Sequence, residues 1–168
     1  VHFKSSKIDS NISLLLALIS IWNINYKNII SNCILTYNHR LRSLSSFIQQ
    51  LEMESNGKSI NNYNQRVDYN TSPFVFGLQG TECQHSIFQM VHQGTLKTSM
   101  DFIGVINSDH SRRRYTLQEK ASSNFLLSNL IAQADLSFDG KQESKQYKIL
   151  NGKNPSTVIL LDMLTPES

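Results

Sequence analysis

The sequence is short of cysteine, and the two that it has are not arranged as a metal site. Cys33 and Cys83 do not form a CxxC pair among the 168 residues. No set of histidines and cysteines has the spacing of zinc ligands, so the sequence predicts no metal. Two isolated cysteines fit a reducing compartment best, and we expect the cytoplasm.

Long apolar runs and runs of like charge are also scarce. The most apolar stretch, Ile12 to Trp22, is 11 residues long and contains two serines, which is too short to span a bilayer. It lacks the charged start and the small-residue cleavage site of a signal peptide, so we interpret it as a buried helix. The only basic run, Arg112 to Arg114, has no interleaved aromatic residues. It predicts a solvated loop or helix start, and we expect neither a nucleic-acid nor a membrane partner.

The remaining residues are organised as alternating strands and helices. Hydrophobic residues make up 39% of the chain, enough for one domain with a core. The expected strands are 33–37, 74–78, 100–106 and 157–164, and the expected helices are 11–26, 41–56, 81–94 and 117–136, with 59–72 a loop and 139–154 helical or irregular. This alternation predicts an α/β fold: a doubly wound, mainly parallel sheet with helices on both faces. No helix follows the last strand, so we expect an incomplete domain that belongs to something larger.

Two glutamates stand at the end of the second expected helix, in "QQLEMESNGK" (49–58). Gln50 and Glu54 are four residues apart and share a helix face, whereas Glu52 points elsewhere. The sequence predicts that Gly57 ends the helix in a left-handed cap. A carboxylate at this end opposes the helix dipole, and broken local rules concentrate at functional sites. Exposed glutamates at helix ends are also common, so the residues alone leave the role of Glu54 open.

A histidine follows the second expected strand. Thr81 and Gln84 have the spacing of a capping box, which places His85 one turn inside the helix. His85, Gln89 and His92 would then share one face. A neutral histidine near a helix start suits proton exchange with a hydroxyl, although a lone helical histidine is more often structural. We expect both this position and Glu54 to lie outside the carboxyl ends of the strands, where such sheets bind ligands.

Two of these motifs together resemble one family. The chain contains "MESNGK" (53–58), "GTECQHSIFQMVHQGT" (80–95) and "DFI" (101–103) in that order. In this order and at this separation, they are similar to the glucose-6-phosphate isomerase family. Flanking stretches such as "LLALISIW" (15–22) and "VILLDMLTP" (158–166) fall in the family's order, so the resemblance covers nearly the whole chain.

The resemblance implies a fold, an activity and site residues. The family is built from two sugar isomerase (SIS) domains, and residues 1–168 would be part of the second. It interconverts glucose 6-phosphate and fructose 6-phosphate in glycolysis and gluconeogenesis, without metal or organic cofactor. Glu54 would be the base of an enediol mechanism, His85 would help to open the sugar ring, and Gln50 would contact the substrate. The histidine reaches the neighbouring subunit's site in the family, which implies a homodimer.

The chain departs from the family pattern beside His85. Glu82 and Cys83 stand where the family has asparagine and glycine. Glu82 would repel a phosphorylated sugar if it faced it, but would be a favourable first-turn acid if turned outward. We interpret Cys83 as a small helix residue rather than as a reactive thiol.

The family's phosphate-binding loop, its glycine-glycine-arginine segment and its C-terminal lysine have no counterpart in these residues. We therefore expect negligible isomerase activity from the isolated chain. Two alternatives to an isomerase segment stay open: a non-catalytic sugar-phosphate-binding or interaction module, and an inactive diverged remnant.

Overall fold

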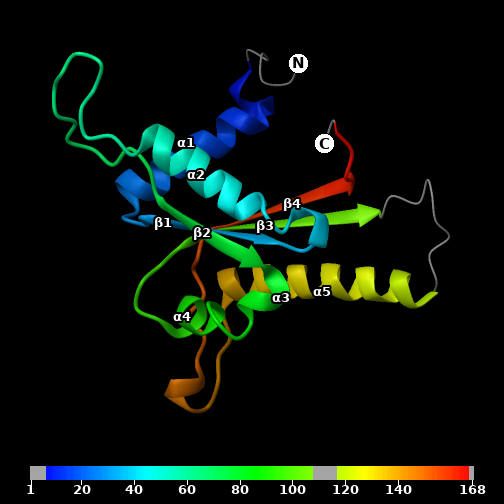
Figure 1. Ribbon diagram of the computed structural model, residues 1–168. Coiled ribbons are helices and arrows are strands. Elements are labelled where there is room, and N and C mark those ends of the chain that lie inside the picture. The colour runs from blue at the N-terminus through cyan, green and yellow to red at the C-terminus, as the bar shows by residue number, and fades with distance from the viewer. Residues whose placement is uncertain (1–6, 108–116, 167–168) are drawn as a thin grey trace.

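A single parallel sheet forms the centre of the protein. The computed structural model describes residues 7–107 and 117–166 (Figure 1). The four strands are β1 (Ser31–Thr36), β2 (Phe74–Gln79), β3 (Ser99–Asn107) and β4 (Ser156–Met163), and their order in the sheet is β2-β1-β3-β4. All three neighbouring pairs are parallel. The predicted parallel sheet is therefore confirmed.

Helices cover both faces of this sheet, as predicted. On one face lie α1 (Ile12–Tyr26) and α2 (Leu44–Asn56), and on the other lie α3 (Gly80–Cys83), α4 (Phe88–Gln93) and α5 (Leu117–Asp139) (Figure 1). Among the described residues, three short 3₁₀ turns, η2 (Ile8–Ser10), η3 (His39–Leu41) and η4 (Gln146–Lys148), accompany these elements. Parallel strands require such crossover connections, because the chain must return to the end of the sheet where the previous strand began before it can start a new strand.

The core has two layers because successive strand residues point to opposite faces. Toward α4 and α5, one cluster gathers buried residues of the strands and helices: Cys33, Leu35, Tyr37, Cys83, Phe88, Val91, Met100, Phe102, Leu130 and Ala134. Toward α2, Ile34, Val75 and Ile103 pack with half-buried side chains that include Ile48 and Met53. Because both faces of the sheet are buried, the strand sequences are nearly continuous apolar runs.

The first two helices show how local signals set their ends. Asn11 caps α1, since its side chain accepts a hydrogen bond from Leu14 N at 3.1 Å. α2 ends at Asn56 as predicted, but the expected left-handed cap is wrong: Gly57 has φ −72°. Instead Lys58 Nζ donates to Glu54 O at 2.7 Å and to Ser55 O. The ammonium thus satisfies carbonyls that the end of a helix leaves free.

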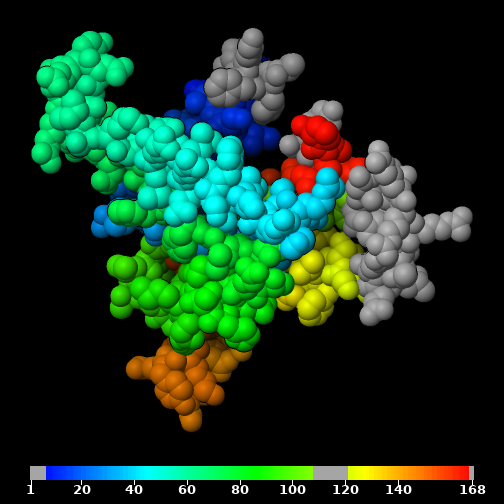
Figure 2. Space-filling view, viewed as in Figure 1, coloured from blue at the N-terminus to red at the C-terminus, as the bar shows by residue number. Residues whose placement is uncertain are grey.

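The two long connections are mostly irregular. Residues 59–72 form the predicted loop, and the 139–154 segment contains only η4 and an isolated bridge between Lys141 and Leu150. Figure 2 shows both segments projecting from the body of the molecule, the loop at the upper left and the second segment at the bottom. The basic run 112–114 lies outside the described residues.

The expectation that the apolar stretch 12–22 is a buried helix is wrong. In α1 only Asn23 and Ile24 are buried. Ile12 is 62% exposed and Trp22 is 51% exposed. The helix rests one narrow side on the sheet, and no segment in the described part of the chain covers its outer side. A search of the described helices finds none that is both long enough and apolar enough to cross a membrane.

Candidate active site

The two glutamates of α2 have different surroundings. Gln50 Nε2 donates a hydrogen bond to Glu54 Oε2 at 3.3 Å, and both side chains are exposed. This confirms that they share a face. Glu52 is partly buried toward Asp101; its pKa is raised chiefly by burial and further by the negative charge of that carboxylate. Of the two, Glu54 is the exposed one, and Glu52 is half-buried.

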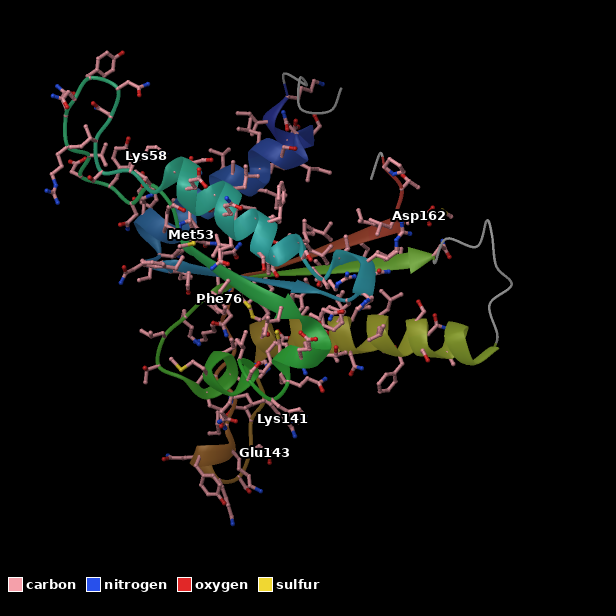
Figure 3. The ribbon with its side chains drawn as sticks, in the orientation of Figure 1. Met53, Lys58, Phe76, Lys141, Glu143 and Asp162 are labelled. Carbon is pink, nitrogen blue, oxygen red and sulfur yellow. The ribbon has the colours of Figure 1, made fainter. Side chains whose placement is uncertain are left out.

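The position of Glu54 relative to the sheet differs from the prediction. α2 follows β1 and precedes the parallel strand β2, so it runs against the strands. Its last turn lies where β2 begins, and Met53 lines a small hollow there with Pro73 and Phe74. Figure 3 shows Met53 and Lys58 at this end of α2. Glu54 therefore lies near the amino ends of the strands, because a crossover helix must end where the next strand starts.

His85 is not inside a helix. The predicted helix 81–94 is split into α3 and α4, and His85 lies exposed in the turn between them. α3 begins at Gly80 without a side-chain cap, so the predicted capping box is wrong. Cys83 and Phe88 are both buried in the same cluster. Five residues of continuous α-helix would turn them about 140° apart, so the chain breaks the helix to bury both.

His92 does not share a face with His85. It is buried, its Nε2 lies 3.0 Å from Gln133 Oε1, and its ring stacks on Phe88 at 5.3 Å. Its Nδ1 is buried without a hydrogen-bond partner. Burial lowers the pKa of His92, and the hydrogen bond with Gln133 opposes that effect in part. These contacts make His92 a packing residue that stays neutral, whereas His85 is free to meet a ligand.

The two unusual residues beside His85 face in opposite directions. Cys83 is fully buried, and burial raises the pKa of its thiol to about 11. This confirms it as a small, unreactive helix residue. Glu82 is exposed, and its carboxylate accepts a hydrogen bond from Gln79 Nε2 at 3.1 Å. The acid is thus turned outward in the first turn of α3.

Glu54 and His85 are not brought together within one chain. Glu54 lies where β2 starts and His85 follows α3, just beyond the end of β2. A six-residue strand is about 20 Å long, so the two side chains belong to opposite ends of the sheet. Within the described residues, no group of three or more histidine, cysteine or acidic side chains could hold a metal.

Sequence reasoning missed two features around α2. One is the Lys58 ammonium over the last carbonyls of α2. The other is a polar cluster at the amino ends of the strands, in which Asn32 Nδ2 donates to Asp101 Oδ2 at 2.7 Å. A signal for the second was present, because Asp101 is the acid inside an otherwise apolar strand.

The arrangement of the sheet defines the class of protein first. A parallel sheet of order β2-β1-β3-β4 with helices on both faces is a doubly wound α/β domain. A family model described as phosphoglucose isomerase matches residues 1–168. The chain belongs to the phosphoglucose isomerase family, which is a family of enzymes.

Individual relatives agree with this assignment. The chain is 40% identical over 181 residues to the glucose-6-phosphate isomerase of Acinetobacter baumannii (strain AYE), covering 98% of the chain and 32% of that relative. It is 42% identical to that of Borrelia garinii subsp. bavariensis, covering 96% and 30%. A solved glucose-6-phosphate isomerase from Chlamydia trachomatis superposes with a TM-score of 0.89 at 32% identity, covering 98% and 32%. The chain thus spans about a third of the length of these relatives.

Proposed function

We propose that this chain is a segment, part of one SIS domain, of an enzyme that interconverts glucose 6-phosphate and fructose 6-phosphate. The observation that carries the proposal is the exposed Gln50–Glu54 pair at the end of α2. The pair lies in a chain that the phosphoglucose isomerase model matches throughout. Two buried free thiols support a reducing compartment, and we place the enzyme in the cytoplasm.

Glu54 acts as the base of this isomerisation. Its carboxylate takes the proton from C2 of the open-chain aldose, and the electron pair of that C–H bond becomes the C1–C2 double bond of an enediol. The carbonyl oxygen at C1 gains a proton. Return of a proton to C1 and loss of one from the C2 hydroxyl give the ketose. Nothing is oxidised or reduced overall, so the chemistry requires neither a metal nor an organic cofactor.

Gln50 helps to aim this carboxylate and contacts the substrate. Its amide Nε2 donates to Glu54 Oε2, which leaves Oε1 available for the proton transfer. Both side chains sit on the same helix, so their relative position is set by one turn of α2. A site held on a regular element keeps its geometry better than a site on loops.

His85 serves a site in a second copy of the chain. It assists opening of the sugar ring by exchanging a proton with the ring oxygen. Within one chain it lies at the opposite end of the sheet from Glu54, too far to act on the same sugar. We therefore propose a homodimer in which each active site combines Glu54 of one subunit with the histidine of the other.

The first experiment tests this segment inside a full-length relative. The 168 residues replace the matching segment of the Acinetobacter baumannii enzyme, and conversion of fructose 6-phosphate is followed in a coupled assay. We expect the chimera to turn over and Glu54→Gln to lower kcat by at least about 100-fold. Asp68→Asn, an exposed loop acid, is the matched control. Full activity in Glu54→Gln would contradict the proposed base.

The isolated 168-residue chain is assayed alongside. We expect no measurable turnover, since the chain spans about a third of the relatives' length and groups that bind the phosphate would lie elsewhere. Turnover that disappears in Glu54→Gln would show that this segment assembles a working site by itself.

Shared sites are tested by complementation. Chimeras with Glu54→Gln and with His85→Ala are each expected to be inactive, but their co-expression should restore about a quarter of the unmodified activity. Random pairing makes half of the dimers mixed, and one of the two sites in each mixed dimer combines an intact Glu54 with an intact His85. One quarter of all sites is therefore intact. Absence of any restored activity would contradict a site built from two subunits.

A further inference from the structure

A second pocket lies on the opposite side of α2 from Glu54. It has a volume of about 360 Å³ and opens between α1, α2 and the amino ends of β1, β3 and β4. One wall is apolar and is formed by Leu16 and Ile19 of α1 together with Ile159 of β4. Nothing in the proposed isomerisation uses this pocket, so its polar groups need a separate explanation.

The floor of the pocket is an ordered polar network. Asn32 Nδ2 donates to Asp101 Oδ2 at 2.7 Å, and Ser99 Oγ donates to Asn32 Oδ1 at 2.8 Å. Thr157 also donates to the Asp101 carboxylate. These bonds come from three neighbouring strands, so the carboxylate is held in a fixed orientation against the sheet.

The charge of the pocket is one-sided. Glu52 reaches it from α2, which brings a second carboxylate close to Asp101, and none of the residues that line it carries a positive charge. Burial raises the pKa of Asp101, while hydrogen bonds from Asn32 and Thr157 oppose this. Two partly buried carboxylates that line one pocket, the charge of one raising the pKa of the other, favour a cation between them.

A buried amide also lines the pocket. Asn23 of α1 is only 5% exposed. Asn23 is not among the described residues whose buried side-chain atoms lack a hydrogen-bond partner, so what remains accessible of its amide faces the hollow. A molecule in the pocket can therefore reach this amide. Its oxygen adds a neutral acceptor to the two carboxylates.

We propose that this pocket binds an ammonium or guanidinium group carried on an alkyl stem. The charged head would donate N–H bonds to Glu52, Asp101 and the Asn23 amide oxygen, and the stem would lie along the apolar wall of α1. The head can come from a free alkyl amine or from a lysine or arginine side chain of a polypeptide. This inference goes beyond the isomerase proposal and does not depend on it.

Calorimetric titration of the chain with agmatine, an alkyl guanidinium, tests the proposal. We expect binding that weakens by about tenfold or more in Glu52→Gln and in Asp101→Asn. Asp162→Asn is the matched control, because Asp162 also accepts an amide hydrogen bond at 2.7 Å, from Asn107, near the other end of the sheet (Figure 3). Binding should also weaken from about pH 7.5 to about pH 5, as the carboxylates take up protons.

A second variant keeps the test valid if the carboxylate variants unfold. Ala17 lines the pocket from α1, and Ala17→Phe should block binding without removing an acid. A blocked acetyl-Gly-Arg-Gly-amide peptide separates the two sources: affinity equal to that of agmatine indicates a polypeptide side chain, and weaker affinity indicates a free amine. No binding of either probe up to about 10 mM, or binding unchanged in Ala17→Phe, overturns the proposal.

Discussion

Glu52 and Glu54 stand two positions apart on α2 and have different chemistry. Two residues along a helix turn a side chain by about 200°, which points one glutamate at the sheet and the other at solvent. Glu54 accepts a hydrogen bond from Gln50, whereas burial and the charge of Asp101 raise the pKa of Glu52. The same residue type is therefore available as an exposed base in one case and as half of an acidic pocket in the other.

His92 makes the stability of the protein depend on pH. Burial holds its pKa below the ordinary value of 6.5. Above that value the imidazole is neutral in both the folded and the unfolded chain. Below it the unfolded chain binds a proton that the folded chain does not, so the free energy of unfolding falls until the lowered pKa is reached.

We expect chemical denaturation to show this loss between about pH 7.5 and about pH 5.5, and to show a smaller loss in His92→Gln. Glu52 and Asp101 have raised pKa values and act in the opposite direction, gaining stability as the pH falls. Their effect is common to both proteins and cancels in the comparison. An equal pH dependence in both proteins would contradict a neutral, buried His92.

At the scale of elements, the start of α3 depends on close packing against Tyr37. The Tyr37 ring is buried and lies directly beneath Gly80, where β2 passes into α3. A Cβ atom at Gly80 would overlap the Tyr37 ring. Glycine is required here by this close approach of backbone to ring, and the approach fixes where the helix starts.

Gly80→Ala should therefore destabilise the protein by about 1–3 kcal/mol, because the added methyl group overpacks a full site. A double-mutant cycle with Tyr37→Leu assigns the cause. The smaller side chain leaves room for the methyl group, so the cost of Gly80→Ala should shrink in that background. Urea unfolding of the four proteins measures the free energy of unfolding of each. An equal loss from Gly80→Ala with Tyr37 present and with Tyr37→Leu would show that the ring is not responsible.

At the scale of the whole molecule, the outer side of α1 is left uncovered by the described residues. Its apolar side chains face solvent, and an exposed apolar patch of this kind marks a surface that other protein covers. The relatives are about three times as long as this chain. The cover that α1 lacks among the described residues can thus come from the rest of such a protein.

Trp22 reports directly on this surface. It is the only tryptophan, it is 51% exposed, and it stacks on Tyr26 at 4.9 Å. We expect acrylamide to quench its fluorescence readily in dilute isolated chain, with Trp22→Phe as the blank. Quenching should weaken as the concentration rises and copies associate through α1. Strong protection in dilute solution would show that α1 is covered within a single chain.

Much of the fold could be predicted from the sequence. The four strands and the ends of α1 and α2 follow from apolar period, from a capping residue at Ser10 or Asn11 and from Gly57 as a stop, which are signals contained within a few residues. The pairing of Gln50 with Glu54 follows from helical spacing. The family follows from two motifs at a fixed separation.

Only the tertiary structure decided which surfaces these elements meet. The sequence spacing of Cys83 and Phe88 did not reveal that both enter one core cluster and split a helix. Nor did it place Glu54 and His85 at opposite ends of the sheet, or gather Asn32 and Asp101, 69 residues apart, beneath α1. Helix caps and periodicity depend on neighbours along the chain, whereas burial and the composition of a site depend on contacts between distant segments.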